Sequence, residues 1–99
     1  KYISRINHVH CKDIRKEILN KSLSNDLSFR DSFLEGVFTV PGDGYINYKP
    51  LFETLYDNKY SKWLIVEAEQ DPKKANPLKY AKIGYKYLNR ILTEVGYRI

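Results

Sequence analysis

The stretch NHVHCKD, residues 7–13, and the stretch WLIVEAEQD, residues 63–71, decide how this chain is expected to fold. Each is a short apolar run in which ionisable side chains recur at every second position. Because successive side chains of a β-strand point to opposite faces, this alternation predicts strands over residues 5–12 and 63–69. The ionisable side chains of each strand then share a face: His8, His10 and Lys12 on the first, Glu67 and Glu69 on the second.

Helical patterns lie between and after these strands, where apolar side chains recur every three or four residues. They predict helices over residues 13–24, 28–36, 48–57 and 77–96. Start signals support three of them: Ser28 and Asn76 as N-caps, Pro50 and Pro77 in first turns. The last helix is expected to bury one apolar face, made of Leu78, Ala81, Tyr85, Leu88 and Leu92. Strands that alternate with helices indicate an α/β fold with a parallel sheet.

An extended segment followed by a turn, VFTVPGDGYINY, occupies residues 37–48. Gly42 and Gly44 are expected to take positive φ angles in this turn, which glycine does at little steric cost. A glycine-rich loop can also cradle a phosphate, but the spacing here matches neither a P-loop nor a dinucleotide-binding fingerprint. A turn is therefore the favoured interpretation.

The composition, with 42% hydrophobic and 29% charged residues over 99 positions, is that of one globular domain or less. No run of about 18 apolar residues occurs, so no bilayer span is predicted. A single cysteine, Cys11, agrees with a cytoplasmic location. The net charge of +5 raises nucleic acid as a partner, but the 17 basic residues are spread along the chain and form no known binding motif. We expect neither a nucleic acid nor a membrane partner.

Two parallel strands cannot bury the apolar faces of these helices, since an independent sheet normally needs three strands or more. The chain also begins without Met, almost at its first strand. We therefore expect a slice of a larger α/β sheet or barrel. Its exposed strand edges are expected to pack against the rest of that barrel or against another copy of the chain.

In such a barrel the ionisable side chains of both strands would gather at the carboxyl ends of the strands, where active sites of barrels are built. Imidazole with carboxylate is a common ligand set for Mn, Fe, Co or Zn, so His10 and Glu67 are candidate metal ligands. Arg15, just past the first strand, is equally expected to hold a substrate oxygen or to be solvated. Three blander alternatives are a structural histidine, a loop or capping role for Glu69, and a surface ion pair of Lys12 with Asp13.

Three stretches closely resemble the C-terminal part of inosose dehydratases, the inositol-catabolism enzymes of the xylose isomerase-like TIM-barrel superfamily. They are HVHCKDIR (residues 8–15), GVFTVPGDGYINY (residues 36–48) and WLIVEAEQDPKKANPLKYA (residues 63–81). The first is shared with many sugar epimerases, whereas the other two are more specific. The resemblance covers nearly all of the chain. It implies that residues 1–99 are the last two βα units of an eight-unit barrel, an incomplete part of one domain.

The resemblance also implies a metal site, because enzymes of this superfamily hold one divalent ion with two Glu, one Asp and one His. The matching residues are His10 and Glu67, and the other two ligands belong to strands outside this chain. Mn or Co is the expected metal, with glutathione as a further expected cofactor. The implied reaction is loss of water from the polyol ketone scyllo-inosose (2-keto-myo-inositol). The implied catalytic residues are Glu67, Lys12 and His8, and the implied substrate contacts are Arg15, Lys12 and Glu69.

Two other function classes compete with this lyase. A sugar epimerase or isomerase on the same barrel would share the metal and the enediolate chemistry, and a small basic α/β module would only bind a partner. The motifs VFTVPGDG and AEQDP favour the dehydratase. The parent enzyme is expected to be a homo-oligomer, and the 99 residues alone are expected to be inactive.

Overall fold

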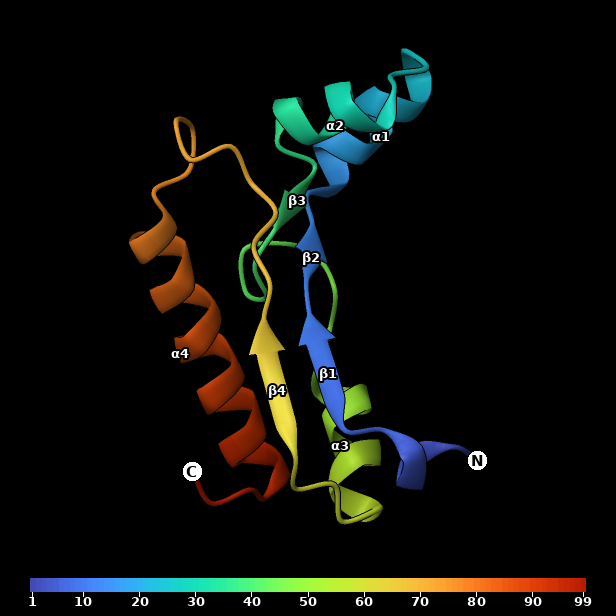
Figure 1. Ribbon diagram of the computed structural model, residues 1–99, viewed down its shortest axis with the longest axis vertical. Helices are drawn as coiled ribbons and strands as arrows, with labels where there is room; N and C mark the ends of the chain where they lie inside the picture. Colours follow the sequence, from blue (N-terminus) through green and yellow to red (C-terminus); the bar gives the residue numbers. More distant parts are fainter.

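The structure is a computed structural model that describes residues 1–99. Its centre is a two-stranded parallel sheet of β1 (His8–Cys11) and β4 (Trp63–Val66), in which each residue of β1 lies beside one of β4. Figure 1 shows the two strands running in the same direction, with the long helix α4 (Pro77–Val95) alongside β4. The helix α3 (Lys49–Asp57) completes the connection from β1 to β4, so the chain forms two βα units.

An excursion interrupts the first unit between β1 and α3. The short strand β2 (Asp13–Ile14) pairs antiparallel with β3 (Phe38–Thr39), and between them the chain forms α1 (Lys16–Ser24) and α2 (Phe29–Glu35). Figure 1 shows these two helices projecting beyond the carboxyl ends of the parallel strands. Strands of two residues carry no periodicity, which explains why the alternation missed this ribbon.

Both parallel strands are shorter than the predicted ranges of residues 5–12 and 63–69. Ile3–Arg5 forms a 3-10 helix, and β1 begins only at His8. The ladder still extends past β4 by one bond, because the N–H of Glu67 donates to the carbonyl of Cys11 at 3.0 Å. Beyond that point the chain leaves β4 and continues into β2, which pairs with β3, so Glu67 and Glu69 follow β4 rather than belong to it. The prediction that Ile14 belongs to a helix is wrong for the same reason.

The helix boundaries follow the capping residues closely. The side chain of Ser28 accepts a hydrogen bond from the N–H of Asp31, and α2 ends at Gly36 with a φ of 90°. The side chain of Asn76 accepts from the N–H of Lys79, directly before the proline that starts α4. These ends were predictable because an N-cap needs a short polar side chain and a left-handed C-cap favours glycine.

The hydrophobic core lies on one face of the parallel sheet. Partly buried strand residues such as Val9, Leu64 and Val66 pack on this core from the sheet. The buried thiol of Cys11 is fully enclosed, and burial raises its pKa to about 11. The core cluster consists of Cys11, Tyr48, Phe52, Leu55, Tyr60, Leu88, Ile91 and Leu92.

The buried face of α4 differs from the predicted one. Leu88 and Leu92 are buried as expected, but Leu78 and Tyr85 are 64% and 62% exposed, and Ala81 is also exposed. A helix of 19 residues is about 28 Å long and a strand of four is about 13 Å, so α4 extends well beyond β4. Its first two turns therefore have no strand of this chain to cover. Gly84 already contacts Val66 of β4, and the next residue, Tyr85, lies on the exposed side of the helix. None of the helices combines the length and apolar character that crossing a bilayer requires.

Candidate active site

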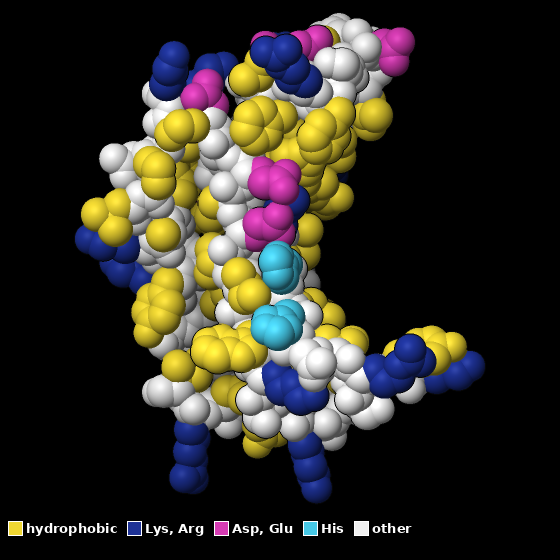
Figure 2. Space-filling model, in the orientation of Figure 1, with side chains coloured by type: hydrophobic (Ala, Val, Ile, Leu, Met, Phe, Trp, Pro, Cys, Tyr) yellow, Lys and Arg dark blue, Asp and Glu magenta, His cyan; other side chains and the backbone are white.

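The face of the parallel sheet opposite α3 and α4 is uncovered and carries the ionisable side chains of both strands. Figure 2 looks onto this face, where the histidines in cyan and acidic side chains in magenta follow one another along the strands. The parallel register places His10 beside Ile65, so the next residue of the same parity on the second strand, Glu67, lies level with Lys12. Two segments far apart in sequence thus bring their charged groups to one edge.

The charged groups form a contiguous cluster at the carboxyl ends of β1 and β4. The Nδ1 atom of His10 is 3.3 Å from Oε2 of Glu67. The ammonium of Lys12 lies 3.4 Å from Oε1 of Glu67 and 3.1 Å from Oε1 of Glu69, and 4.9 Å from the ring centre of Phe38. The structure therefore brings together four of the predicted site residues.

The cluster favours a carboxylate on Glu67 and an ammonium on Lys12. Partial desolvation acts to raise the pKa of Glu67, but hydrogen bonds with Glu69, Lys12 and His10 outweigh it and hold this pKa below its ordinary value. Desolvation likewise acts to lower the pKa of Lys12, yet hydrogen bonds to Glu69 and Glu67 raise it. Both groups are thus charged near neutral pH.

The geometry of His10 and Glu67 fits two ligands of one metal ion. Two atoms that each bind an ion at about 2.1 Å lie roughly 3.0–3.4 Å apart, depending on the coordination geometry. The separation of 3.3 Å between Nδ1 and Oε2 falls in this range. The chain holds no group of three or more His, Cys, Asp or Glu side chains that could bind a metal by itself. The pair therefore fits as part of a larger ligand set.

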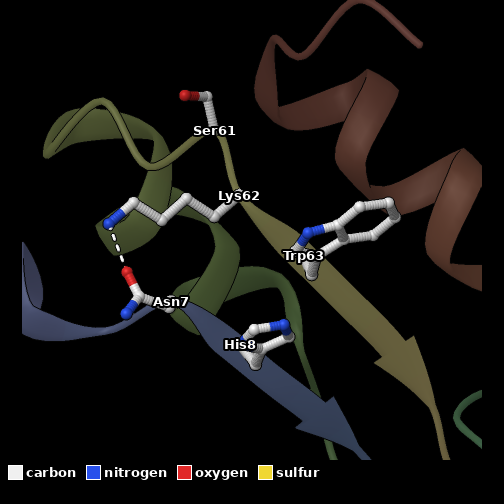
Figure 3. Close-up of a pocket in the computed structure, with 5 residues that line it drawn as sticks. All are labelled: Asn7, His8, Ser61, Lys62 and Trp63. Atoms are coloured by element: carbon white, nitrogen blue, oxygen red, sulfur yellow. Dashed lines mark hydrogen bonds between the residues drawn. The ribbon is translucent and has the colours of Figure 1, made fainter.

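His8 lies apart from this cluster, at the amino end of β1. It pairs in register with Trp63, two residues before His10, which is about 7 Å along the strand. Figure 3 shows its ring next to the Trp63 indole, in an open hollow of about 570 Å³, where Lys62 donates to the side chain of Asn7. This hollow is at the opposite end of the strands from Glu67.

Arg15 connects β3, two loops and helix α4 at the carboxyl edge. Its Nη1 donates to the carbonyl oxygens of Gly36 and Phe38, at 2.8 and 3.2 Å. The alternative of a solvated arginine is wrong, because the terminal nitrogens of its guanidinium are engaged by protein acceptors. A substrate oxygen would have to bind at Nε or displace one of these acceptors. The acceptors of Nη2 are Asp43 at 2.8 Å, Gln70 at 3.1 Å and Tyr80 at 3.3 Å. Sequence reasoning missed these three, since no spacing or motif connects them.

Asp13 does not form the surface ion pair with Lys12 that was considered. Its carboxyl group is buried, 1% exposed, and points away from the Lys12 ammonium into the turn formed by residues 41–47. Gly42 has the predicted positive φ, 94°, but Gly44 does not. Gly44 is required for space instead, because a Cβ atom there would lie 2.2 Å from Cγ of Asp13.

Parallel βα units with an ionisable cluster at the carboxyl edge are the architecture of a (β/α) barrel enzyme. The sequence matches the xylose isomerase-like TIM barrel family over residues 1–97, and the chain belongs to that family.

Several curated proteins resemble the chain closely. It is 56% identical over 92 residues to an inosose dehydratase of Mesomycoplasma hyopneumoniae, which covers 92% of this chain and 31% of that protein. It is 52% identical over 95 residues to an inosose dehydratase of Bacillus licheniformis, covering 96% of this chain and 32% of the relative. The rhizopine catabolism protein MocC of Rhizobium meliloti is 48% identical over 99 residues, covering 100% of the chain and 30% of the relative. The chain thus spans about a third of the length of these relatives.

Proposed function

We propose that the full-length protein carrying this chain is an inosose dehydratase, a cytoplasmic carbon–oxygen lyase that removes water from scyllo-inosose. The observation that carries the proposal is the cluster of His10, Lys12, Glu67 and Glu69 at the carboxyl edge of the strands. It is supported by membership of a barrel family and by relatives of about 50% identity that are named inosose dehydratase.

His10 and Glu67 are the residues of this chain that would hold a divalent metal, with Mn or Co as the proposed ion and the remaining ligands on other strands. A bound divalent ion supplies Lewis acidity at the ketone, which acidifies the adjacent C–H bond. The chain offers an imidazole nitrogen and a carboxylate oxygen, a donor pair suited to such ions. Glutathione is proposed as a further cofactor.

Two residues of the cluster carry out the two proton transfers of the elimination, one as the base and one as the acid. Glu67, as a carboxylate, accepts the proton from the carbon next to the ketone. Lys12, as an ammonium, donates a proton to the departing hydroxyl group, which leaves as water while the carbon–carbon double bond forms. The resulting enol tautomerises to the diketone. Lys12 suits the acid role better than His8, because it contacts Glu67 whereas His8 lies at the other end of the strand.

The substrate would be held beside this cluster by polar groups at the same edge. Glu69 lies within 3.1 Å of the Lys12 ammonium and can accept a hydrogen bond from a substrate hydroxyl with its free oxygen lone pairs. Arg15 is proposed to bind a substrate oxygen through Nε, or through Nη2 if one of its present acceptors gives way. Glu69 and Arg15 both lie just past the carboxyl ends of strands, where ligands of such barrels bind.

Turnover of scyllo-inosose by the full-length protein tests the function. We expect formation of the diketone, seen as a new ultraviolet absorbance, in the presence of Mn or Co and its loss after chelation. Lys12→Met should abolish it, whereas Lys62→Met, which changes an exposed lysine at the opposite end of the strands, should leave it intact. Conversion of the substrate to an isomer without that absorbance would instead identify an epimerase or isomerase.

The 99 residues alone are proposed to be inactive and to associate through their strand edges. Each parallel strand has only one partner, so each keeps an unpaired edge that can bind the rest of the barrel or another copy. Light scattering should detect assemblies, and titration with Mn should show weak binding, because only two ligands are present. A monomer that binds Mn at micromolar affinity or turns over inosose would contradict this proposal.

A further inference from the structure

We propose that Asp13 is a positioning residue for Lys12: its carboxyl group, seated in the space left by Gly44, holds the backbone directly after Lys12 and so directs the ammonium towards Glu67 and Glu69. The inference rests on the proposed function in one respect, namely that Lys12 transfers a proton. The contacts themselves are independent of any activity.

The first support is the way Asp13 holds the turn of residues 41–47. A single oxygen, Oδ1, accepts hydrogen bonds from three backbone N–H groups: Ile14 at 2.7 Å, Tyr45 at 3.1 Å and Ile46 at 3.1 Å. The absence of a side chain at Gly44 lets the turn close over the carboxyl group. Charge-assisted hydrogen bonds of this kind are the strong ones, so the turn and β2 are joined at this atom.

The second support is the cost of the arrangement. Asp13 is the only buried acidic residue of the chain, and its Oδ2 is enclosed without a hydrogen-bond partner. Burying a carboxyl group with an unpaired oxygen is unfavourable, and the three bonds of Oδ1 offset this cost only in part. A buried carboxyl group that costs stability at this point indicates that its role is to position neighbouring residues.

The third support is that Lys12 is held on both sides. Its carbonyl oxygen accepts a hydrogen bond from the hydroxyl of Tyr48, while the next residue is Asp13. Burial raises the pKa of Tyr48 to about 12, so this hydroxyl stays a donor. β2 also pairs Ile14 with Phe38, whose ring lies beneath the Lys12 ammonium. Neighbouring side chains on an extended chain point to opposite sides. Holding Asp13 against the turn of residues 41–47 therefore directs Lys12 to the open face of the sheet.

The test compares Asp13→Ala with Asp13→Asn in the full-length enzyme. Asp13→Ala should lower kcat about 10- to 100-fold with KM and Mn affinity unchanged, because misplacement of a catalytic group acts on the chemical step. Asp13→Asn keeps the shape and one carbonyl oxygen, so it should recover most of kcat. Asp57→Ala, which removes an exposed carboxylate at the end of α3, is the matched control and should leave kcat unchanged.

Gly44→Ala gives a second variant. It places a methyl group 2.2 Å from both Cγ and Oδ1 of Asp13 and should reproduce the loss of kcat. Asp13→Ala removes these two contacts, so the double variant should lose less activity than the product of the two single losses. If the kcat losses of the two single variants simply multiply in the double variant, the proposed contact between Asp13 and the position of Gly44 has no role in activity.

Two measurements separate this proposal from the proposed function. Amide hydrogen exchange at Ile46, whose N–H donates to Asp13, should be slow in the parent and fast in Asp13→Ala, whatever the enzyme catalyses. A crystal structure of Asp13→Ala should show the Lys12 ammonium more than 4 Å, roughly the limit of an ion pair, from Glu69. An unmoved Lys12, or an Asp13→Ala enzyme with a lower melting temperature but parental kcat, would overturn the positioning role.

Discussion

The two faces of the β1–β4 sheet carry side chains of the same two strands and have opposite properties. On the covered face, Cys11 is fully buried and its thiol pKa is raised to about 11, so the polar group stays neutral. On the open face, at the residues directly after the two strands, Lys12 has a raised pKa and Glu67 a lowered one, so both stay charged. Residues that are neighbours in sequence thus meet opposite electrostatic conditions.

The difference shows how a barrel strand separates stability from chemistry. One parity of residues packs against α3 and α4 and holds the strands in place. The other parity presents ligands and charges on a support that these helices make rigid, which is what a preorganised site requires. Changes on the open face should therefore alter activity, and changes on the covered face should alter stability.

The largest expected effect is on the open face. In the full-length enzyme, His10→Ala and Glu67→Gln should each abolish turnover and weaken Mn binding, because each removes one proposed ligand. The melting temperature without metal should change little, since neither side chain is buried. Assays of turnover and metal titration check this. A variant that keeps nearly full activity with stoichiometric metal would show that the ligand assignment is wrong.

Phe52→Ala should have the largest effect on the covered face. Phe52 is 0% exposed in the centre of the core cluster, so its truncation should lower the free energy of unfolding by about 3–5 kcal/mol. Urea denaturation of the full-length protein measures the loss. The affinity of the folded variant for Mn should stay at the parental value. A large drop in that affinity would mean that the two faces are coupled.

Gly84→Ala should have a smaller effect at the contact between α4 and β4. A Cβ atom at Gly84 would lie 2.6 Å from Cγ1 of Val66, so the helix must move or Val66 must shift. Overpacking of this kind costs about 1–3 kcal/mol, which exceeds the gain of about 1 kcal/mol in helix propensity. Thermal unfolding shows whether Gly84→Ala lowers or raises the stability. Lys82→Ala, on the exposed side of the same helix, is the control and should be nearly neutral.

The smallest expected effect is a pH dependence that Tyr48 causes. Burial raises the pKa of Tyr48 to about 12 in the folded chain, above the value of about 10 for an unfolded tyrosine. A raised folded pKa contributes stability below pH 10 that is lost as the pH rises towards 12. Tyr48→Phe should therefore lose less stability than the parent between these values. Equal losses in melting experiments at pH 9 and 11 would contradict the assignment.

The sequence by itself determined the βα order, the ends of α2, the start of α4 and the parity of the strand residues. Ser28 and Asn76 act through side-chain hydrogen bonds to N–H groups three residues further on, and Gly36 and Pro77 through their own backbone geometry. Both effects are local and can therefore be predicted from sequence. The grouping of His10, Lys12, Glu67 and Glu69 was also predictable, because parallel strands bring their carboxyl ends to one edge.

Only the tertiary structure decided the contacts that depend on close approach of distant segments. The bonds of Arg15 to Asp43, Gln70 and Tyr80 join two loops and helix α4, and no periodicity in the sequence predicts these contacts. The sequence alone suggested a backbone reason for Gly44, whereas the reason is the space that Asp13 occupies. The buried face of α4 likewise depends on where β4 ends. Local geometry is encoded residue by residue, but packing is set by whichever surfaces the folded chain brings together.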